Sequence, residues 1–293
     1  MVLVIFLYLS FLAFIGFSVQ KALAFAKMPM HGRWELYPVP KEKGKGHYGG
    51  SYYEEVKWWT RPRETSRWEE LVDMGKEILF IKKLFQNQRP FWWLSYALHL
   101  GIYFIFCWFV LLFVHFFLPV QILSFLIVFT GSLGMVLVAV GSAGLLLKRM
   151  VHHEFKIYTT AQEYFNLAFL FVVAATGFLS WIQDGAFQYG QELMKSMLTW
   201  APFSPDPMVA IHLTLFGLLM IYIPLTKMSH YVGKFFTFHQ VLWDNEPFIP
   251  GNEIARKVKE AQTYAPEKSW SGPHYPGTAS KTEERKEGGA IGG

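Results

Sequence analysis

Long apolar segments alternate with polar ones along the whole chain, and this alternation is the strongest signal in the sequence. A helix needs roughly 18 or more apolar residues to cross the hydrocarbon core of a bilayer. Five segments meet that length: 1–26, 91–118, 120–147, 161–182, and a fifth that begins near residue 208 and includes 211–231. The pattern therefore predicts an all-α membrane protein, a five-helix transmembrane bundle.

The first segment, 1–26, allows two interpretations. The small residues that close it, from Ala22 to Ala26, are typical of a signal-peptide cleavage site. Signal peptides open with positive charge, however, and the only charged residue here is Lys21, which comes late. We interpret the segment as a retained helix in which Lys21 extends toward the membrane surface.

Two polar regions flank the remaining spans. Residues 27–90 form an insertion between the first and second spans, and residues 240–293 form a polar C-terminal tail. Within the insertion, Ser66 and Glu69 make a capping box. Apolar side chains then recur on one helical face: Leu71, Met74, Ile78, Ile81 and Phe85. This pattern predicts an amphipathic helix that lies either on the membrane surface or against a partner subunit.

Basic residues near the span ends predict the orientation. They are Lys27, Lys82, Lys83, Arg89, Lys148, Arg149, Lys156, Lys227 and Lys234. With five spans all of these fall on one side, whereas the loop 183–207 on the other side carries only Lys195. The positive-inside rule then puts the N-terminus outside and the insertion and tail in the cytoplasm. We expect a multi-pass protein of the cytoplasmic (inner) membrane.

Composition narrows the chemistry. The single cysteine, Cys107, excludes a disulfide framework and an iron–sulfur cluster ligated by this chain. Any electrons carried here would therefore travel on haem, flavin or quinone. The net charge of +5 lies largely outside the apolar segments, which indicates a membrane surface and no nucleic acid.

Two further features concern the spans themselves. The third span contains small residues that permit close helix approach in lipid: Gly131, Gly134, Gly141, Ser142 and Gly144. The fifth contains Pro224, which removes a backbone donor and should bend the helix.

Four histidines lie within the spans, which is costly in lipid and typical of functional sites. His212 and His230 are eighteen residues apart, five full turns of an ideal helix, so both leave the same face about 27 Å apart. With the N-terminus outside, His99 lies at the depth of His230, and His115 at that of His212. The region 91–239 is therefore a candidate four-helix haem-binding unit that clamps two haems by paired histidines.

The two pairs differ. His99 and His115 are sixteen residues apart, which places them 160° apart around an ideal helix. Either the second span rotates through a bend or His115 is not a ligand. For each of the four histidines, the alternative role is a hydrogen bond to a neighbouring group.

Several stretches resemble the membrane cytochrome b family of the respiratory nitrate reductase gamma subunit. That family includes the haem b subunits of membrane-bound heterodisulfide reductase and of sulfate-reducer transmembrane redox complexes. The matching stretches are 98–102, 145–149, Thr159-Thr160, and His212 through Pro224-Leu225 to His230. The resemblance covers about 89–239, and the first helix more weakly.

The resemblance implies that His99 and His230 bind the cytoplasmic haem and that His212 binds the outer one. The chain departs from the family pattern at Phe109, the position where the family normally has the second ligand of the second span. His115-Phe116-Phe117 resembles the family's His-Phe-Phe, displaced by six residues. The long insertion 27–90 favours the heterodisulfide reductase and sulfate-reducer side of the family.

The expected function is that of a haem b electron-transfer subunit in a quinone-linked oxidoreductase complex. It would carry two haems, and at least one, with menaquinone or another quinone as substrate. Its expected partners are the lipid bilayer, a cytoplasmic iron–sulfur subunit similar to heterodisulfide reductase, and further membrane or extracytoplasmic cytochrome c subunits. The chain offers no catalytic residues for a soluble substrate. The alternative is a cofactor-free membrane anchor or scaffold, and a transporter is disfavoured because the spans contain no interior acid.

Overall fold

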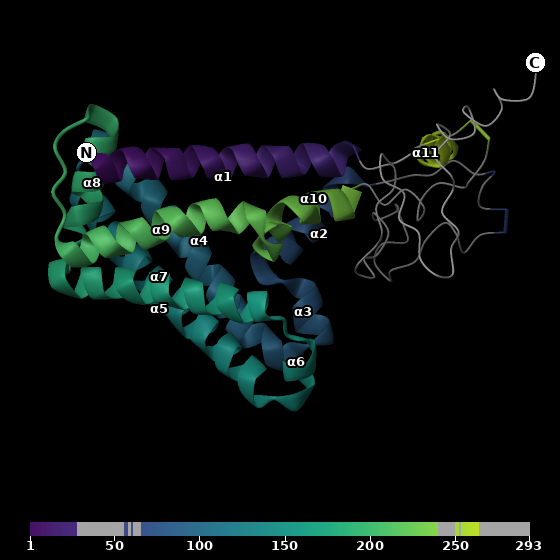
Figure 1. Cartoon of the computed structure of the whole chain (residues 1–293), viewed down its shortest axis with the longest axis horizontal. Helices are drawn as coiled ribbons and strands as arrows, with labels where there is room; N and C mark the ends of the chain where they lie inside the picture. The colour runs from purple at the N-terminus through teal and green to yellow at the C-terminus, as the bar shows by residue number, and fades with distance from the viewer. Residues whose placement is uncertain (28–55, 58–59, 61–65, 240–249, 252, 264–293) are drawn as a thin grey trace, which may run out of the picture.

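Five apolar helices dominate the computed structural model, which describes residues 1–27, 56–57, 60, 66–239, 250–251 and 253–263 (Figure 1). They are α1 (Val2–Lys27), α4 (Arg89–Phe117), α5 (Gln121–Val151), α7 (Ala161–Asp184) and α9 (Pro207–Leu225). Even the shortest has 19 residues, and about 28 Å of rise nearly matches the hydrocarbon core. No strand occurs within these ranges. The protein is an all-α membrane bundle, as the hydrophobic pattern predicts.

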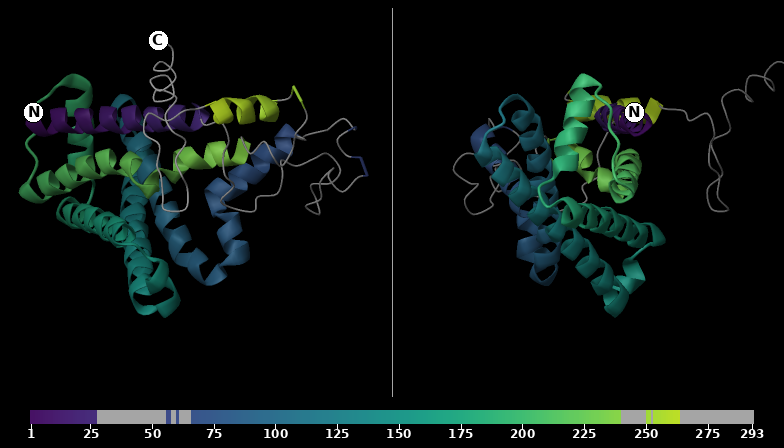
Figure 2. Two further views of the ribbon diagram at one scale, coloured as in Figure 1. Left: turned by 45° about the vertical axis from the view of Figure 1, so that its right-hand side comes forward. Right: turned by 90° about the vertical axis from the view of Figure 1, so that its left-hand side faces the viewer.

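The five spans form a curved row in space whose order differs from their order in sequence. Helix α1 packs on α9, α9 on α7, α7 on α5, and α5 on α4 (Figures 1 and 2). The N-terminus of α1 lies at one end of the bundle beside α8 (Gln188–Thr199). The opposite end carries α6 (His153–Tyr158) and α10 (His230–His239). We call these the α8 end and the basic end, since Lys148, Arg149 and Lys156 lie at the latter.

Helices α4 and α5 approach each other through glycines, as predicted for the third span. A methyl group added to Gly101 would come within 2.8 Å of the Gly134 carbonyl oxygen. One added to Gly141 would come within 2.6 Å of the Leu98 backbone nitrogen. Only residues without a β-carbon allow backbones this close, which fixes the face that α4 turns toward α5.

The stretch predicted as the loop 183–207 contains a helix. Helix α8 lies across the end of the bundle and buries Tyr189, Gly190, Met194 and Ser196. The side chain of Phe187, just before the helix, is fully buried although its backbone adopts a left-handed φ of 56°. The polar composition of this stretch hid an amphipathic helix that closes the α8 end.

The insertion helix begins where the capping box predicts. Helix α2 (Arg67–Phe80) is capped by Ser66, whose hydroxyl accepts from the Glu69 backbone N–H at 3.4 Å. A left-handed Ile81 then separates it from α3 (Lys82–Asn87). The Trp92 indole N–H donates to the Phe80 carbonyl at 2.7 Å, so α2 is fastened to α4 of its own chain. Five of its large apolar side chains stay exposed: Trp68, Leu71, Ile78, Leu79 and Phe80.

Most of the insertion and tail lies outside the described residues, namely 28–55, 58–59, 61–65, 240–249, 252 and 264–293. Within the tail, α11 (Glu253–Thr263) is a short helix with an ion pair between Arg256 and Glu260.

The fifth span is interrupted, which goes beyond the bend predicted at Pro224. Helix α9 ends at Leu225, a 3-10 turn covers Lys227–Ser229 (η3), and α10 begins at His230. The Thr226 hydroxyl accepts from the Met228 backbone N–H at 3.3 Å and so starts the turn. His212 and His230 therefore lie on separate helices, and counting turns of one ideal helix does not relate their faces.

Candidate functional site

The structure brings His99 and His230 together at the basic end of the bundle. Their ring centres are 6.0 Å apart and the ring planes make an angle of 64°. His99 lies on α4 and His230 is the first residue of α10, so the two are far apart in sequence. Two of the four predicted ligands are thus neighbours in space.

The His99 ring is held in a defined orientation. Its Nδ1 lies 2.7 Å from the carbonyl oxygen of Ser95, one turn earlier on α4. A carbonyl can only accept, so Nδ1 carries the hydrogen and a neutral ring presents the lone pair of Nε2. Metal-binding histidines commonly use this second hydrogen bond to fix their tautomer and direction.

The break in the fifth span positions His230. The Lys21 ammonium of α1 donates to the Pro224 carbonyl at 3.1 Å and to the Ser229 hydroxyl at 2.8 Å. The Tyr231 ring stacks on Phe14 of α1, with ring centres 5.8 Å apart. Lys21 was expected to reach the membrane surface, but it instead satisfies the polar groups of the break next to His230.

The spacing of the two rings suits two-histidine ligation of one metal. With a metal–nitrogen bond of about 2 Å on each side, imidazoles that share a metal have their ring centres roughly 6 Å apart. The observed 6.0 Å falls at this value. Neither α9 nor α10 is among the helices that pack closely on α4 in the described chain, so the two histidines come from helices whose backbones stay apart. His99 and His230 are the residues that would hold a haem here.

A charged pair borders the two histidines. Lys234, one turn after His230 on α10, lies close enough to His99 for its charge to act on the ring. The same ammonium lies 3.2 Å from a carboxylate oxygen of Glu77 on α2. The Tyr103 hydroxyl donates to the Ile78 carbonyl. Helix α2 therefore covers this part of the site.

His212 occupies a different setting in the other half of the bundle. It is 8% exposed, and its Nδ1 lies 3.3 Å from the Thr176 hydroxyl oxygen on α7. A methyl group added to Gly177 would meet the His212 ring at 2.7 Å. Because the Thr176 hydroxyl donates to backbone carbonyls of its own helix, its oxygen accepts from His212 Nδ1. The His212 ring therefore packs directly against α7.

His115, the fourth predicted ligand, is hydrogen-bonded to α5. Its Nε2 lies 3.1 Å from the Ser124 hydroxyl of α5. It also lines a cavity of about 320 Å³ at the α8 end, together with Gln191, Glu192 and Lys195. Among the described ring contacts, none joins His115 to His212. The structure brings together the basic-end pair and not the second pair.

Large aromatic side chains fill the interior at the α8 end. Trp108 of α4 packs on Phe187 with ring centres 5.3 Å apart, and both would touch a methyl group on Gly131. Three buried donors of this cluster have no hydrogen-bond partner in the described structure: Trp108 Nε1, Trp181 Nε1 and Tyr189 OH. Burial raises the pKa of Tyr189, so its hydroxyl stays protonated.

Sequence reasoning missed the supporting residues of the site. Ser95 precedes His99 by four positions, a spacing that would have suggested the backbone bond. Lys21 and Thr176 are remote in sequence from the histidines they support, and only the packing of α1 on α9 and of α7 on α9 reveals them.

Within the described ranges, no group of three or more His, Cys, Asp or Glu side chains is placed to hold a metal ion. A two-histidine haem site needs no such group. Comparisons with protein families, with curated proteins and with solved structures found no match to this chain.

Proposed function

We propose that this protein is a haem b electron-transfer subunit of a membrane oxidoreductase complex. The observation that carries the proposal is the pair of His99 and His230, whose ring centres are 6.0 Å apart although the residues belong to different helices. The Ser95 carbonyl directs one of the rings, and Lys21 supports the segment that presents the other. The haem, when bound, supplies one-electron redox chemistry.

The residues around the pair have separate roles in this proposal. His99 and His230 would hold the haem iron. Lys234 and Glu77 form an ion pair beside the two histidines and would tie α2 to α10 at the site. Helix α2 lies over the site and limits access of water from the basic end. The basic residues at this end support a cytoplasmic placement for it by the positive-inside rule, and the proposal puts the chain in the cytoplasmic membrane.

The partners follow from the resemblance and from the exposed surfaces. A cytoplasmic iron–sulfur subunit would dock at the basic end, where α2 keeps Leu71 and Ile78 exposed. Membrane quinone, such as menaquinone, would be the other redox partner. Because this chain contributes a single cysteine, further clusters or c-type haems belong to other subunits.

The direct test is a reduced-minus-oxidised absorbance spectrum of the complete chain purified in detergent. We expect b-type bands, which His99→Ala and His230→Ala each remove at the basic-end site. His153→Ala is the matched control, since His153 is exposed at the start of α6. A purified, folded chain without b-type bands would refute the proposal.

A second haem is proposed on His212 and His115, and haem stoichiometry decides it. Two haems per chain would require the His115 ring to leave Ser124, which is bonded to its Nε2, whereas His212 would keep its Nδ1 bond to Thr176 and ligate through Nε2. One haem would assign both rings to interhelical hydrogen bonds.

A cofactor-free scaffold is the second candidate function, and one observation favours it. His212 and His115 each make a hydrogen bond to a hydroxyl on a neighbouring helix, which is the contact a purely structural histidine makes in a membrane bundle. In that case His99 and His230 would also be structural, and replacing them would leave the absorbance of the chain unchanged.

A further inference from the structure

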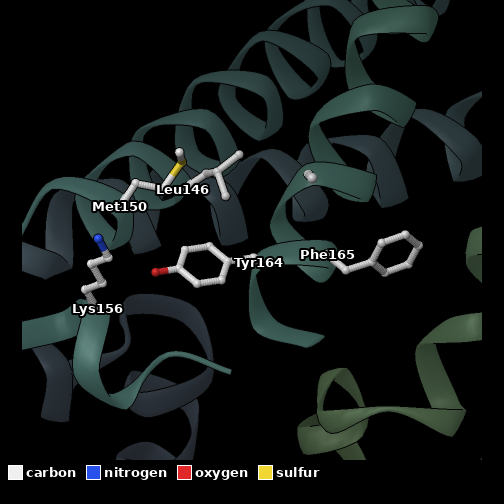
Figure 3. Close-up of a pocket in the computed structure, with 6 residues that line it drawn as sticks. Leu146, Met150, Lys156, Tyr164 and Phe165 are labelled. Atoms are coloured by element: carbon white, nitrogen blue, oxygen red, sulfur yellow. The ribbon is translucent and has the colours of Figure 1, made fainter. Parts of the chain in front are cut away.

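A groove opens on the outer surface of the bundle at the basic end, and neither His99 nor His230 lines it. It has a volume of about 470 Å³ and lies between the end of α5, α6 and the start of α7 (Figure 3). The residues that line it are Leu146, Met150, Lys156, Tyr164, Phe165 and Ala168. We call it the α5–α7 groove. Its walls are almost entirely apolar, apart from Lys156 and the Tyr164 hydroxyl.

The polar groups gather at one end of the groove. In Figure 3 the Lys156 ammonium and the Tyr164 hydroxyl point toward the same side, next to Met150. Tyr164 donates to the carbonyl oxygen of Arg149 at 3.1 Å, which ties the groove to that residue. The Arg149 guanidinium donates to the Thr159 hydroxyl at 3.3 Å, but its buried Nε has no partner in the described structure.

Lys156 brings a positive charge to this end of the groove. Lys156 makes no ion pair within the described part of the chain. The Glu163 carboxylate accepts from the Thr160 backbone and hydroxyl at 2.7 and 3.0 Å and lies 3.7 Å from Lys227. Its charge acts on Lys227 and on Arg149. Lys156 is therefore the cation that lines the groove without an ion pair in the described part of the chain.

The position of the groove in the bilayer defines what can enter it. Arg149 lies in the last turn of α5, and α7 begins at Ala161, so the charged mouth is at the membrane surface. Leu146 and Ala168 lie about a turn deeper, where lipid chains surround the bundle. An occupant must therefore combine an anionic head with an apolar tail and must arrive from the lipid phase.

We propose that the α5–α7 groove binds one anionic phospholipid. Its phosphate lies beside the Lys156 ammonium, and one acyl chain follows the wall formed by Leu146, Phe165 and Ala168. An ammonium attracts phosphate as a point charge. A zwitterionic lipid would bring a second cation toward Lys156 and is disfavoured by charge. The site is independent of the histidines and of any haem.

Lipid retention by the intact protein tests the proposal. The full chain is purified in detergent, exchanged into mixed micelles with phosphatidylglycerol or phosphatidylcholine, and examined by native mass spectrometry. We expect one retained phosphatidylglycerol per chain and at least tenfold less phosphatidylcholine. Lys156→Gln should reduce retention about tenfold. Lys195→Gln at the α8 end is the matched control and should retain lipid like the wild type.

Two further experiments test whether the ligand is a lipid with an acyl chain or a free phosphate. Ala168→Trp fills the apolar wall and should abolish retention while the helix content remains unchanged. Inorganic phosphate should not displace the lipid, because it lacks the acyl chain. Equal retention of both lipids, equal retention by Lys156→Gln, or displacement by inorganic phosphate or by a short-chain quinone would each overturn the proposal. His99→Ala should retain the lipid, so this test does not depend on the haem.

Discussion

The two halves of the bundle hold their histidines in different ways. At the basic end, the rings of His99 on α4 and His230 on α10 lie next to each other, with centres 6.0 Å apart. At the α8 end, His115 and His212 each bond to a hydroxyl on a neighbouring helix. The sequence predicts two pairs, one per leaflet, and already sets the His115–His212 pair apart, because His99 and His115 leave different faces of an ideal helix. The structure teaches that two histidines at the same depth in the membrane form a pair only where the helices bring their rings together.

The difference has a local cause. The break after Leu225 places His230 at the start of a separate helix, α10, where its ring lies next to that of His99. His212 lies on the regular part of α9 and follows that helix onto Gly177. A fifth span without Pro224 would carry both histidines on one face, and one of them would lose its present neighbour.

The largest expected effect comes from removing one member of the basic-end pair. His230→Ala should eliminate the haem of that site completely, whereas His115→Ala should leave it in place. Haem per chain, measured by the pyridine haemochrome assay, distinguishes the two variants. If His115→Ala lost as much haem as His230→Ala, the two halves of the molecule would be equivalent and our comparison would fail.

Adding a methyl group at Gly177 should disturb the half of the bundle that contains His212 and leave the basic end unchanged. Gly177→Ala would push against His212 at 2.7 Å, and overpacking of this kind costs about 1–3 kcal/mol. Thermal unfolding in detergent should show that loss, while the spectrum of the basic-end haem stays the same. Gly75→Ala is the control, because nothing lies near an added methyl group there. A changed basic-end spectrum in Gly177→Ala would mean that the halves are coupled.

Lys21→Met should lower the stability of the break in the fifth span that precedes His230, without changing either histidine. The substitution removes the donor to Pro224 and Ser229, and we expect a loss of about 1–2 kcal/mol together with a shifted haem potential. A potentiometric titration measures the shift, and Lys195→Met serves as the matched control. An unchanged potential with an unchanged melting temperature would show that α1 does not position His230.

The smallest effect is expected at Ser124. Ser124→Ala removes the hydroxyl bonded to His115, and interhelical hydrogen bonds in membranes contribute about 0.6 kcal/mol on average. The haem content should stay at the wild-type value. A gain of haem in this variant would reveal that Ser124 withholds His115 from ligation, and the α8 end would then be a second site.

Much of the fold follows from the sequence because the bilayer restricts what a chain can do. Five apolar segments longer than the hydrocarbon core must become helices, and Ser66 with Glu69 marks the start of α2. The juxtaposition of His99 and His230 was also foreseen from topology and depth. These predictions depend on local pattern and on one global constraint.

Three features escaped prediction because they depend on packing between distant segments. The bend expected at Pro224 became a full break because Thr226 starts a new turn and Lys21 satisfies the freed carbonyl. Helix α8 was hidden by its polar composition, since its buried face forms by packing on helices distant in sequence, among them α4 and α1. The turn of His212 toward Thr176 depends on the absence of a side chain at Gly177.

The packing of α1 on α9 has a consequence for the way the protein is made. Tyr8, Ser18 and Lys21 find their partners at Met197, Tyr231 and Pro224, so α1 is completed by segments that are synthesised long after it. At a synthesis rate of about 5–20 residues per second, α1 waits roughly 10–40 s for these contacts. Helices α4, α5 and α7 can assemble meanwhile. We therefore expect α1, with an unsatisfied lysine, to be accessible to a membrane insertase or quality-control protease when translation stalls before α9.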